Sequence, residues 1–408
     1  MKQKIVTYRT KILVTGIQGI ASGSNFLLVI LLTRIYGLKT LGIYSMLWVV
    51  QVFSMSLHQS AVLSPLVTIW PKTNSNSLWV KFFNYNFIVA LLLAIGSFIF
   101  TNYAVVVSSK WTISSYSLQI FLLVFAICLH LFNRRTLINL QFYIGAFIAD
   151  FLVYVPLLFV ILFYKPELST LLYFQVLFIW AGVITGLIAL KSRIKIKKVD
   201  KDFFKEVSKF SRWLILTSSA QWFSGNFFLI AVGSVSGPAG MGIIRIGQSA
   251  MGVFSVLFLA IENRVPFSAS KLLHFEGKNS FKKYMFDLFK KGEALIIIGA
   301  SLVSATSVFI IRVVYGASYE NYYWVLILFS LLQIFIFTST ILQITLRTLE
   351  KTQIIFVAYV ITSLTSIILA FPLVENFGIL GAIAGLFLTQ IIAIAWYFFN
   401  LFKKWKTV

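Results

Sequence analysis

The feature that most constrains the fold is a series of twelve apolar runs separated by short polar or charged breaks. A helix needs roughly 20 apolar residues to cross the hydrocarbon core of a bilayer, and each run is near or above that length. The runs are 12–33, 41–70, 83–107, 115–132, 142–164, 168–190, 213–235, 240–261, 293–315, 322–346, 352–374 and 379–402. Because lipid offers the backbone no hydrogen bonds, we predict an all-α integral membrane protein with twelve transmembrane helices.

The composition supports the membrane class. Hydrophobic residues make up 59% of the chain and charged residues 12%, whereas soluble globular domains carry about 25% charged residues. A net charge of +23 could indicate nucleic acid, but the charges fall between the apolar runs, so no nucleic-acid partner is expected. The single cysteine, Cys128, lies inside an apolar run, which excludes a disulfide within the chain.

The basic residues predict the orientation of the chain, because Lys and Arg in short loops stay on the cytoplasmic side. With twelve spans, most of the 35 Lys and Arg residues fall on one side, together with both termini. The segment 263–292 is too charged to span and mixes large apolar side chains with lysines. We expect it to form an amphipathic helix on the inner membrane surface.

An internal repeat predicts two matching halves. Residues 24–44 (SNFLLVILLTRIYGLKTLGIY) and 225–245 (GNFFLIAVGSVSGPAGMGIIR) each read as an apolar helix, a glycine-containing turn and the start of a second helix. Asn226 in the second copy matches Asn25 in the first, and the most charged stretch of the chain lies between the copies. We therefore predict an N-terminal six-helix lobe at 1–190, a basic cytoplasmic linker at 191–212 and a C-terminal six-helix lobe at 213–408.

Polar residues at helical spacing within the spans are candidates for substrate binding. Asn25 belongs to such a stripe on the first predicted helix and Gln51 to one on the second, while Arg245 and Gln248 share a face in the second half. Asn226 is a candidate as the counterpart of Asn25. For any single residue, a hydrogen bond between helices is the commoner role. Stripes in both halves favour a cavity between the lobes, because polar side chains facing lipid are costly.

The charged residues of the spans are few. Arg245 is placed inside a span, and it is the best candidate for contact with an anionic substrate. Arg34 is also a candidate, although it lies near the outer end of its helix, where snorkelling to the surface explains it equally well. Asp150 is the main buried acid of the first half. It either pairs with Arg134 or Arg135 or carries a coupling ion.

Catalytic motifs are absent from the sequence. There is no GxxxxGK[ST], GxSxG or HExxH pattern, and His58, His130 and His274 lack metal-ligand spacing. We predict a protein that is not an enzyme, with no catalytic residue, metal or cofactor.

Three short motifs resemble a known family. Residues 34–44 (RIYGLKTLGIY) resemble the R-x-x-G…x-G-x-Y segment between the first two helices of the polysaccharide transporter family. Residues 237–242 (GPAGMG) resemble its second-half counterpart, and residues 377–382 (FGILGA) resemble the G-x-x-G-A opening of the last helix. This family, which includes O-antigen and capsule repeat-unit flippases, belongs to the MOP superfamily together with multidrug and toxin extrusion (MATE) exporters and lipid II flippases.

The resemblance implies two six-helix lobes related by a pseudo-twofold axis, with alternating access between them. It implies transport of an undecaprenyl-diphosphate-linked oligosaccharide, for lipopolysaccharide or capsule, from the cytoplasmic to the outer leaflet of a bacterial inner membrane. The implied partners are this substrate, membrane lipids, an ion gradient and a glycan polymerase. Two alternatives stay open: a cation-coupled MATE-like exporter depending on Asp150, and a membrane-embedded glycan polymerase or ligase.

Overall fold

The computed structural model describes residues 2–73, 76–191 and 201–406. Within these residues every regular element is helical and no strand occurs, which confirms the predicted all-α class. Residues 192–200 of the predicted linker lie outside the described part of the chain.

The chain divides into two compact units, residues 1–219 and 220–408. The division falls inside helix α7 (Lys201–Val235), beyond the end of the predicted linker. The beginning of α7 belongs to the first unit because Phe203 and Val207 pack into an aromatic cluster there, with Phe82 edge-on to Phe203 at 4.9 Å between ring centroids. The symmetry relation between two lobes stays a prediction.

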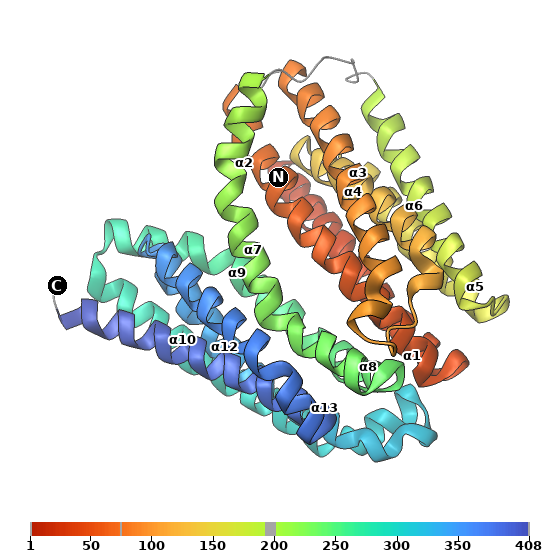
Figure 1. Cartoon of the computed structure of the whole chain (residues 1–408). Helices are drawn as coiled ribbons and strands as arrows, with labels where there is room; N and C mark the ends of the chain where they lie inside the picture. The colour runs from red at the N-terminus through yellow and green to blue at the C-terminus, as the bar shows by residue number, and fades with distance from the viewer. Residues whose placement is uncertain (1, 74–75, 192–200, 407–408) are drawn as a thin grey trace. The chain divides into compact units, whose positions relative to one another are not determined.

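The first unit is a bundle of long helices (Figure 1). Its helices are α1 (Lys2–His58), α2 (Ser64–Thr73), α3 (Asn76–Val107), α4 (Ser117–Asn139), α5 (Tyr143–Phe163) and α6 (Leu168–Leu190), with a π-helical turn at Gln59–Leu63 and a 3-10 turn at Ser114–Tyr116. Helix α1 consists of two arms that meet at Gly37, whose φ of 83° is readily available only to glycine. The glycine turn of the first repeat copy is thus confirmed.

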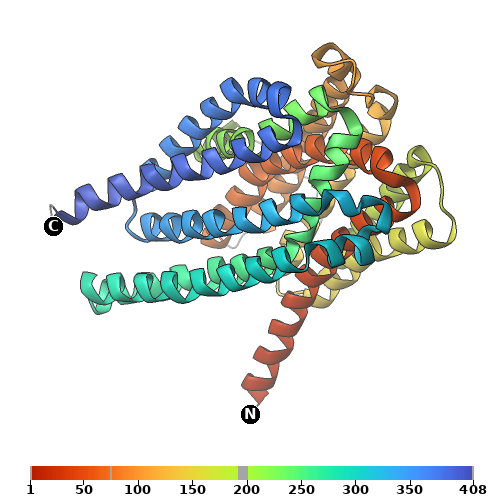
Figure 2. The ribbon, with the colours of Figure 1, turned by 90° about the horizontal axis from the view of Figure 1, so that it is seen from below.

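The second unit also contains a long helix that a glycine turn divides into two arms, and this helix is the last element of the chain (Figure 2). Its further helices are α8 (Gly237–Ala250), α9 (Gly252–Phe275), α10 (Lys278–Ala305), α11 (Ser307–Ile310), α12 (Tyr323–Thr348) and α13 (Thr352–Lys406), with short turns at Ile311–Tyr315 and Ala317–Tyr322. Helix α13 folds back at Gly378, where φ is 58°. Its arms pack together, since the Trp396 indole N–H donates to the Ile354 carbonyl at 3.1 Å.

Eight described helices are long and apolar enough to cross a membrane, or nine when the bent pair Lys278–Ala305 and Ser307–Tyr315 counts as one span. Two of the eight, Gly19–Trp70 and Thr352–Leu401, contain 52 and 50 residues. At 1.5 Å per residue, each is more than twice as long as the roughly 30 Å hydrocarbon core. Both contain a glycine turn, so each holds two of the predicted spans. Helix α7 is not among the eight, because Gln, Asn and Ser lower the hydropathy of its apolar half.

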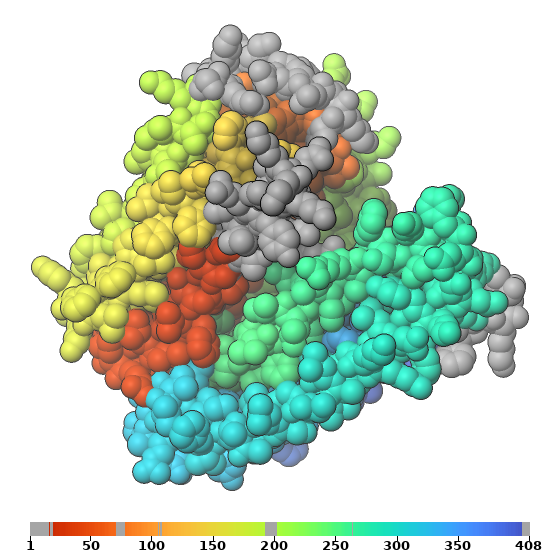
Figure 3. Space-filling view, turned by 180° about the vertical axis from the view of Figure 1, so that it is seen from behind, coloured from red at the N-terminus to blue at the C-terminus, as the bar shows by residue number. Residues whose placement is uncertain are grey.

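The prediction of a separate surface helix at 263–292 is wrong. This segment forms the end of α9, a turn at Gly277 with φ of 85°, and the first half of α10. The periodicity of the segment belongs to two long helices, and its lysines are divided between the end of α9 and the first half of α10. Several of its large apolar side chains are nevertheless exposed, including Phe267 and Phe275, and the teal side chains of this region lie on the surface in Figure 3.

Helix α6 approaches α4 and α5 closely through two glycines. A Cβ atom on Gly182 would lie 2.5 Å from Val153 Cγ2 and 3.0 Å from the Ala149 carbonyl oxygen, and one on Gly186 would lie 2.9 Å from Asn133 Cβ. Gly182 and Gly186 form a GxxxG pattern, which brings helix backbones together in membranes. These two glycines position α6 against the helices that build the site described below.

We therefore expect Gly182→Ala to destabilise the first unit, although alanine favours helix by about 1 kcal/mol over glycine. Overpacking of this kind costs about 1–3 kcal/mol. The matched control is Gly96→Ala in α3, where an added Cβ meets nothing within 4 Å. Cys128 is fully buried and is the single cysteine, so the temperature at which a thiol-reactive dye labels it reports unfolding. Equal labelling temperatures for the two variants would contradict the close packing.

Candidate functional site

A cavity of about 240 Å³ with a partly polar lining, hereafter the polar cavity, lies inside the first unit. Both arms of α1 line it, together with α4, α5 and α6. Its polar and large aromatic lining residues are Asn25, Tyr44, Trp48, Gln51, Tyr154 and Gln175. The structure thus brings together two predicted site residues, Asn25 and Gln51, from the two arms of α1.

The lining of this cavity is partly polar and uncharged, because no Asp, Glu, Lys or Arg belongs to it among the described residues. The Gln175 amide N–H donates to the Tyr44 hydroxyl at 3.4 Å. The other amide atom, Gln175 Oε1, is buried and accepts no hydrogen bond from any described residue. The cavity therefore offers amide and hydroxyl groups to a ligand that carries neutral donors and acceptors.

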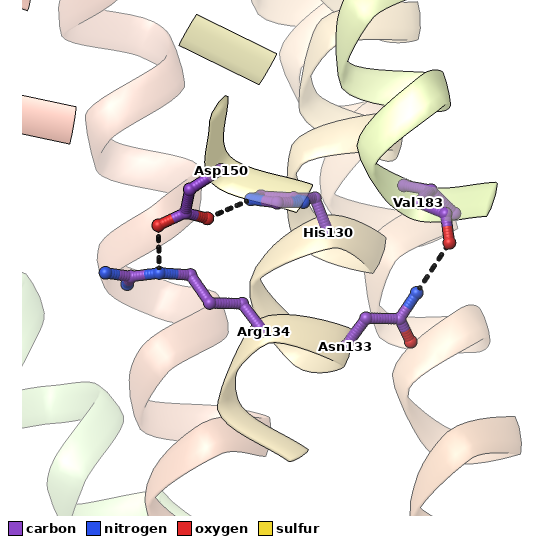
Figure 4. Close-up of polar contacts among 5 residues, drawn as sticks. All are labelled: His130, Asn133, Arg134, Asp150 and Val183. Carbon is purple, nitrogen blue, oxygen red and sulfur yellow. Dashed lines mark hydrogen bonds and ion pairs between the residues drawn. The ribbon is translucent and has the colours of Figure 1, made fainter. Parts of the chain in front are cut away.

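A buried charge cluster joins α4 to α5 (Figure 4). The Arg134 Nε–H donates to Asp150 Oδ2 at 2.7 Å, and His130 Nε2 lies 2.9 Å from Asp150 Oδ1. The side chains of Asp150 and His130 have no exposed surface, while that of Arg134 is 22% exposed. His130 and Arg134 are one helical turn apart on α4, so both reach the same carboxylate on α5.

The hydrogen bonds orient the imidazole in this cluster. Because the Asp150 carboxylate accepts, His130 donates from Nε2. His130 Nδ1 is buried, has no hydrogen-bond partner among the described residues, and lies close to Gly182. The cluster therefore places a guanidinium and an imidazole on the two oxygens of one carboxylate.

The cluster lies directly behind the polar cavity. Ile127 on α4 and Tyr154 on α5 line the cavity, and His130 and Asp150 follow about one helical turn away on the same two helices. Asp150 itself does not line the cavity. The predicted pairing of Asp150 with Arg134 is confirmed, and a role in ion coupling stays a prediction.

Two other predicted site residues, Arg34 in the first unit and Asn226 in α7, do not line this cavity. Arg34 is exposed and does not belong to the cavity lining, as expected for a side chain that snorkels to the surface. The Asn226 amide N–H donates to the Trp222 carbonyl of its own helix at 3.0 Å. The structure thus gives Asn226 a local hydrogen bond, and binding by Asn226 or Arg34 stays a prediction.

Arg245 and Gln248 lie on the short helix α8. Arg245 is 5% exposed, and Gln248 is half-buried. The sequence also predicts that Ser249 and Gly252 continue the face of Arg245 and Gln248, but this face is interrupted, because α8 ends at Ala250 and α9 begins at Gly252 after a break at Met251. Ser249 on that face instead contacts the Tyr315 hydroxyl at 2.8 Å. A cavity between the lobes, with Arg245 in its wall, stays a prediction.

Sequence reasoning missed two parts of the site. His130 was named only as a residue without metal-ligand spacing, although its position four residues before Arg134 placed both on one face. The GxxxG pattern at Gly182 and Gly186 was also present in the sequence. Among the described residues, no group of three or more His, Cys, Asp or Glu side chains could hold a metal ion.

Comparisons with known proteins support the fold. No protein-family model and no curated protein sequence matches the chain. An inward-facing MATE multidrug resistance transporter of the MOP superfamily is similar, with a TM-score of 0.73, 10% identity and coverage of 98% of this chain and 99% of that one. The lipid II flippase MurJ in an inward closed conformation has a TM-score of 0.71 and 16% identity, covering 97% of this chain and 87% of that one.

A MOP superfamily transporter from Pyrococcus furiosus is also similar, with a TM-score of 0.61 and 10% identity over 95% of this chain and 94% of that one. The chain is therefore a multi-pass membrane protein with the fold of MOP superfamily transporters. These three similar structures are two transporters and a flippase.

We expect the charge cluster to make a large contribution to stability. Arg134→Leu leaves the Asp150 carboxylate buried without its counter-charge, and breaking a buried ion pair in this way costs about 3–5 kcal/mol. Asp150→Asn should cost less, because Arg134 can turn toward solvent. The double variant should recover part of the loss, since neither charge remains. The temperature at which the dye labels Cys128 measures the stability of all three variants.

The matched control is the surface pair of Arg312 and Glu320, whose side chains are 66% and 41% exposed and 3.9 Å apart. Arg312→Leu should change stability by no more than about 1 kcal/mol. Additive effects of Arg134→Leu and Asp150→Asn would show that the two side chains do not interact.

Proposed function

We propose that the protein is a flippase for an undecaprenyl-diphosphate-linked oligosaccharide, such as an O-antigen or capsule repeat unit. The observation that carries this proposal is the uncharged lining of the cavity in the first unit. Asn25, Gln51 and Gln175 supply amides, while Tyr44 and Trp48 supply aromatic surfaces. Sugars present hydroxyl groups at their edges and C–H groups on their faces, so they match a wall of amides and rings.

A lipid-linked sugar of this class also carries a diphosphate, which is very costly to move through hydrocarbon unaided. A guanidinium binds phosphate oxygens through paired hydrogen bonds. Arg245, a buried cation in the apolar helix α8, supplies this group in the proposal. Alternating access would then expose the sugar and diphosphate sites to one membrane face at a time.

The comparison with MurJ supports a lipid-linked substrate, because a lipid II flippase shares the fold over nearly the whole chain. The proposed location is a bacterial inner membrane with both termini in the cytoplasm, in accord with the distribution of Lys and Arg. The same proposal includes an ion gradient as the energy source for transport. It also includes a glycan polymerase that uses the transported oligosaccharide.

The second candidate function is cation-coupled multidrug export, which the similarity to a MATE transporter favours. Such an exporter needs a negative site for cationic drugs. The cavity has no acidic lining residue among those described, and both oxygens of the nearby Asp150 carboxylate contact basic side chains. These contacts favour the flippase. The similarity to transporters likewise gives no support to a glycan polymerase or ligase.

The cavity is tested by Gln51→Leu, a variant of similar size that loses the amide. At about 1 kcal/mol for each lost hydrogen bond, one or two lost bonds should slow glycan export about five- to thirtyfold. Surface glycan is measured in cells that lack their own exporter and is divided by the amount of membrane protein.

The matched control is Gln119→Leu. Gln119 is a buried glutamine of the same unit, but its amide donates to Ser169 at 2.9 Å and it lies outside the cavity lining. Its loss should lower stability rather than the export rate per molecule. Full export by Gln51→Leu would remove the cavity from the transport path.

Arg245 provides a separate test. Arg245→Ala should stop export at normal protein levels, and Arg245→Lys should restore part of it, because a mobile headgroup needs the charge more than the fork geometry. Arg312→Ala is the control, since Arg312 is exposed. Normal export by Arg245→Ala would overturn the assigned role, and equal loss in the Ala and Lys variants would show that charge is not what matters.

A further inference from the structure

Two adjoining cavities lie between α10, α12 and α13 in the second unit, and the first of them also contacts the turn that joins α12 to α13. The first has a volume of about 330 Å³ and a partly polar lining, while the second, of about 420 Å³, is almost wholly apolar. Lys282 and Leu401 line both cavities, so the two meet at these side chains. Together they form one site with a polar end and an apolar end.

The polar-to-apolar order is the same along each helix. On α10, Lys278 lines the first cavity, and Phe286 and Phe289 line the second. On α12, Leu346 lines the first cavity and Ile341 the second. The polar end therefore lies at the ends of the helices. The apolar end begins beside it, since the adjacent residues Thr345 and Leu346 line the second and the first cavity, and it extends further along the helices.

The polar end is basic. Lys278, Lys282 and Lys351 line the first cavity together with the amides of Asn279 and Asn400, and no Asp or Glu belongs to its lining among the described residues. Three lysines beside an apolar groove fit an anionic headgroup attached to a hydrocarbon chain. A lone apolar face would not specify such a ligand, but this order of charge and apolar surface does.

We propose that this site binds one anionic phospholipid of the surrounding membrane, with its phosphate at the three lysines and an acyl chain in the apolar cavity. Phe286 is 55% exposed, so the apolar cavity is accessible along its edge. Lys290 Nζ lies 4.6 Å from the Phe286 ring centroid, which adds a further cation beside the chain. Under the predicted orientation, the site faces the cytoplasmic leaflet, where anionic lipids and basic segments attract each other.

A phospholipid fits this site better than a sugar-bearing lipid does. The first cavity has Phe281 as its single aromatic lining residue among those described, so it offers far less stacking surface to a sugar than the cavity of the first unit. The site is also independent of the proposed flippase function, because its ligand is a resident lipid and not the transported molecule.

The test is a titration of the purified full chain in detergent, followed by native mass spectrometry. The ligands are phosphatidylglycerol, phosphatidylcholine with the same acyl chains, and undecaprenyl phosphate. Phosphatidylglycerol should bind at least about tenfold more tightly than phosphatidylcholine, because each lysine near an anionic headgroup strengthens binding by about fivefold. The triple variant Lys278→Gln, Lys282→Gln, Lys351→Gln should remove this preference.

A second variant and a control isolate the two ends. Leu342→Trp fills the apolar cavity that Leu342 lines, so it should weaken both phospholipids while leaving the lysines in place. Replacing the exposed Lys39, Lys205 and Lys209 by Gln removes the same charge outside both cavities and should leave the preference unchanged. Equal binding of the two phospholipids, an unchanged preference in the triple variant, or tighter binding of undecaprenyl phosphate at this site would each overturn the proposal.

Discussion

The carboxylate of Asp150 is buried in the helix bundle of the first unit, and it is tolerated there because Arg134 and His130 both contact it. A carboxylate in this position without partners would cost several kcal/mol. The contacts fix α4 against α5 in one register, and the next turns of these same two helices form part of the cavity wall. Close approach of α6 at Gly182 completes the packing around the imidazole. The geometry of the polar cavity therefore depends on a charge cluster that does not line it.

The sequence predicted those parts of the fold that depend on local pattern. Apolar runs separated by glycine turns predicted the helices on either side of Gly37 and Gly378. The polar stripes singled out Asn25 and Gln51, which line one cavity, although this cavity lies inside the first unit and the predicted one lay between the lobes. These signals are strong because lipid leaves a membrane chain few alternatives to the helix.

Other features depend on contacts between distant segments, so the sequence did not predict them. The partner of Asp150 was left open between two arginines, and the choice of Arg134 over Arg135 depends on how α4 is rotated against α5. The break between α8 and α9 at Met251 was not predicted, because Gly252, which follows it, is a residue that also occurs inside continuous membrane helices. The segment 263–292 was assigned to the membrane surface because its composition suits both a surface helix and the ends of two long helices.

Multidrug exporters and lipid II flippases share this fold, so the residues that line the cavity must distinguish the two functions. The two similar structures with the higher TM-scores are a multidrug transporter and a lipid II flippase, so overall similarity does not separate the two activities. An uncharged lining with amides and aromatic rings favours a sugar, and the neutralised Asp150 leaves little negative charge for a cationic drug. The function follows from the chemistry of the site and not from the fold.

The most direct test is transport by the purified protein in lipid vesicles. Vesicles that contain a fluorescent undecaprenyl-diphosphate-linked oligosaccharide are treated with an impermeant quencher of the label, and parallel vesicles are loaded with the cationic dye ethidium. The account predicts that the protein makes the inner-leaflet sugar accessible to the quencher and leaves the ethidium where it is. Gradient-driven movement of ethidium, with no movement of the lipid-linked sugar, would contradict it.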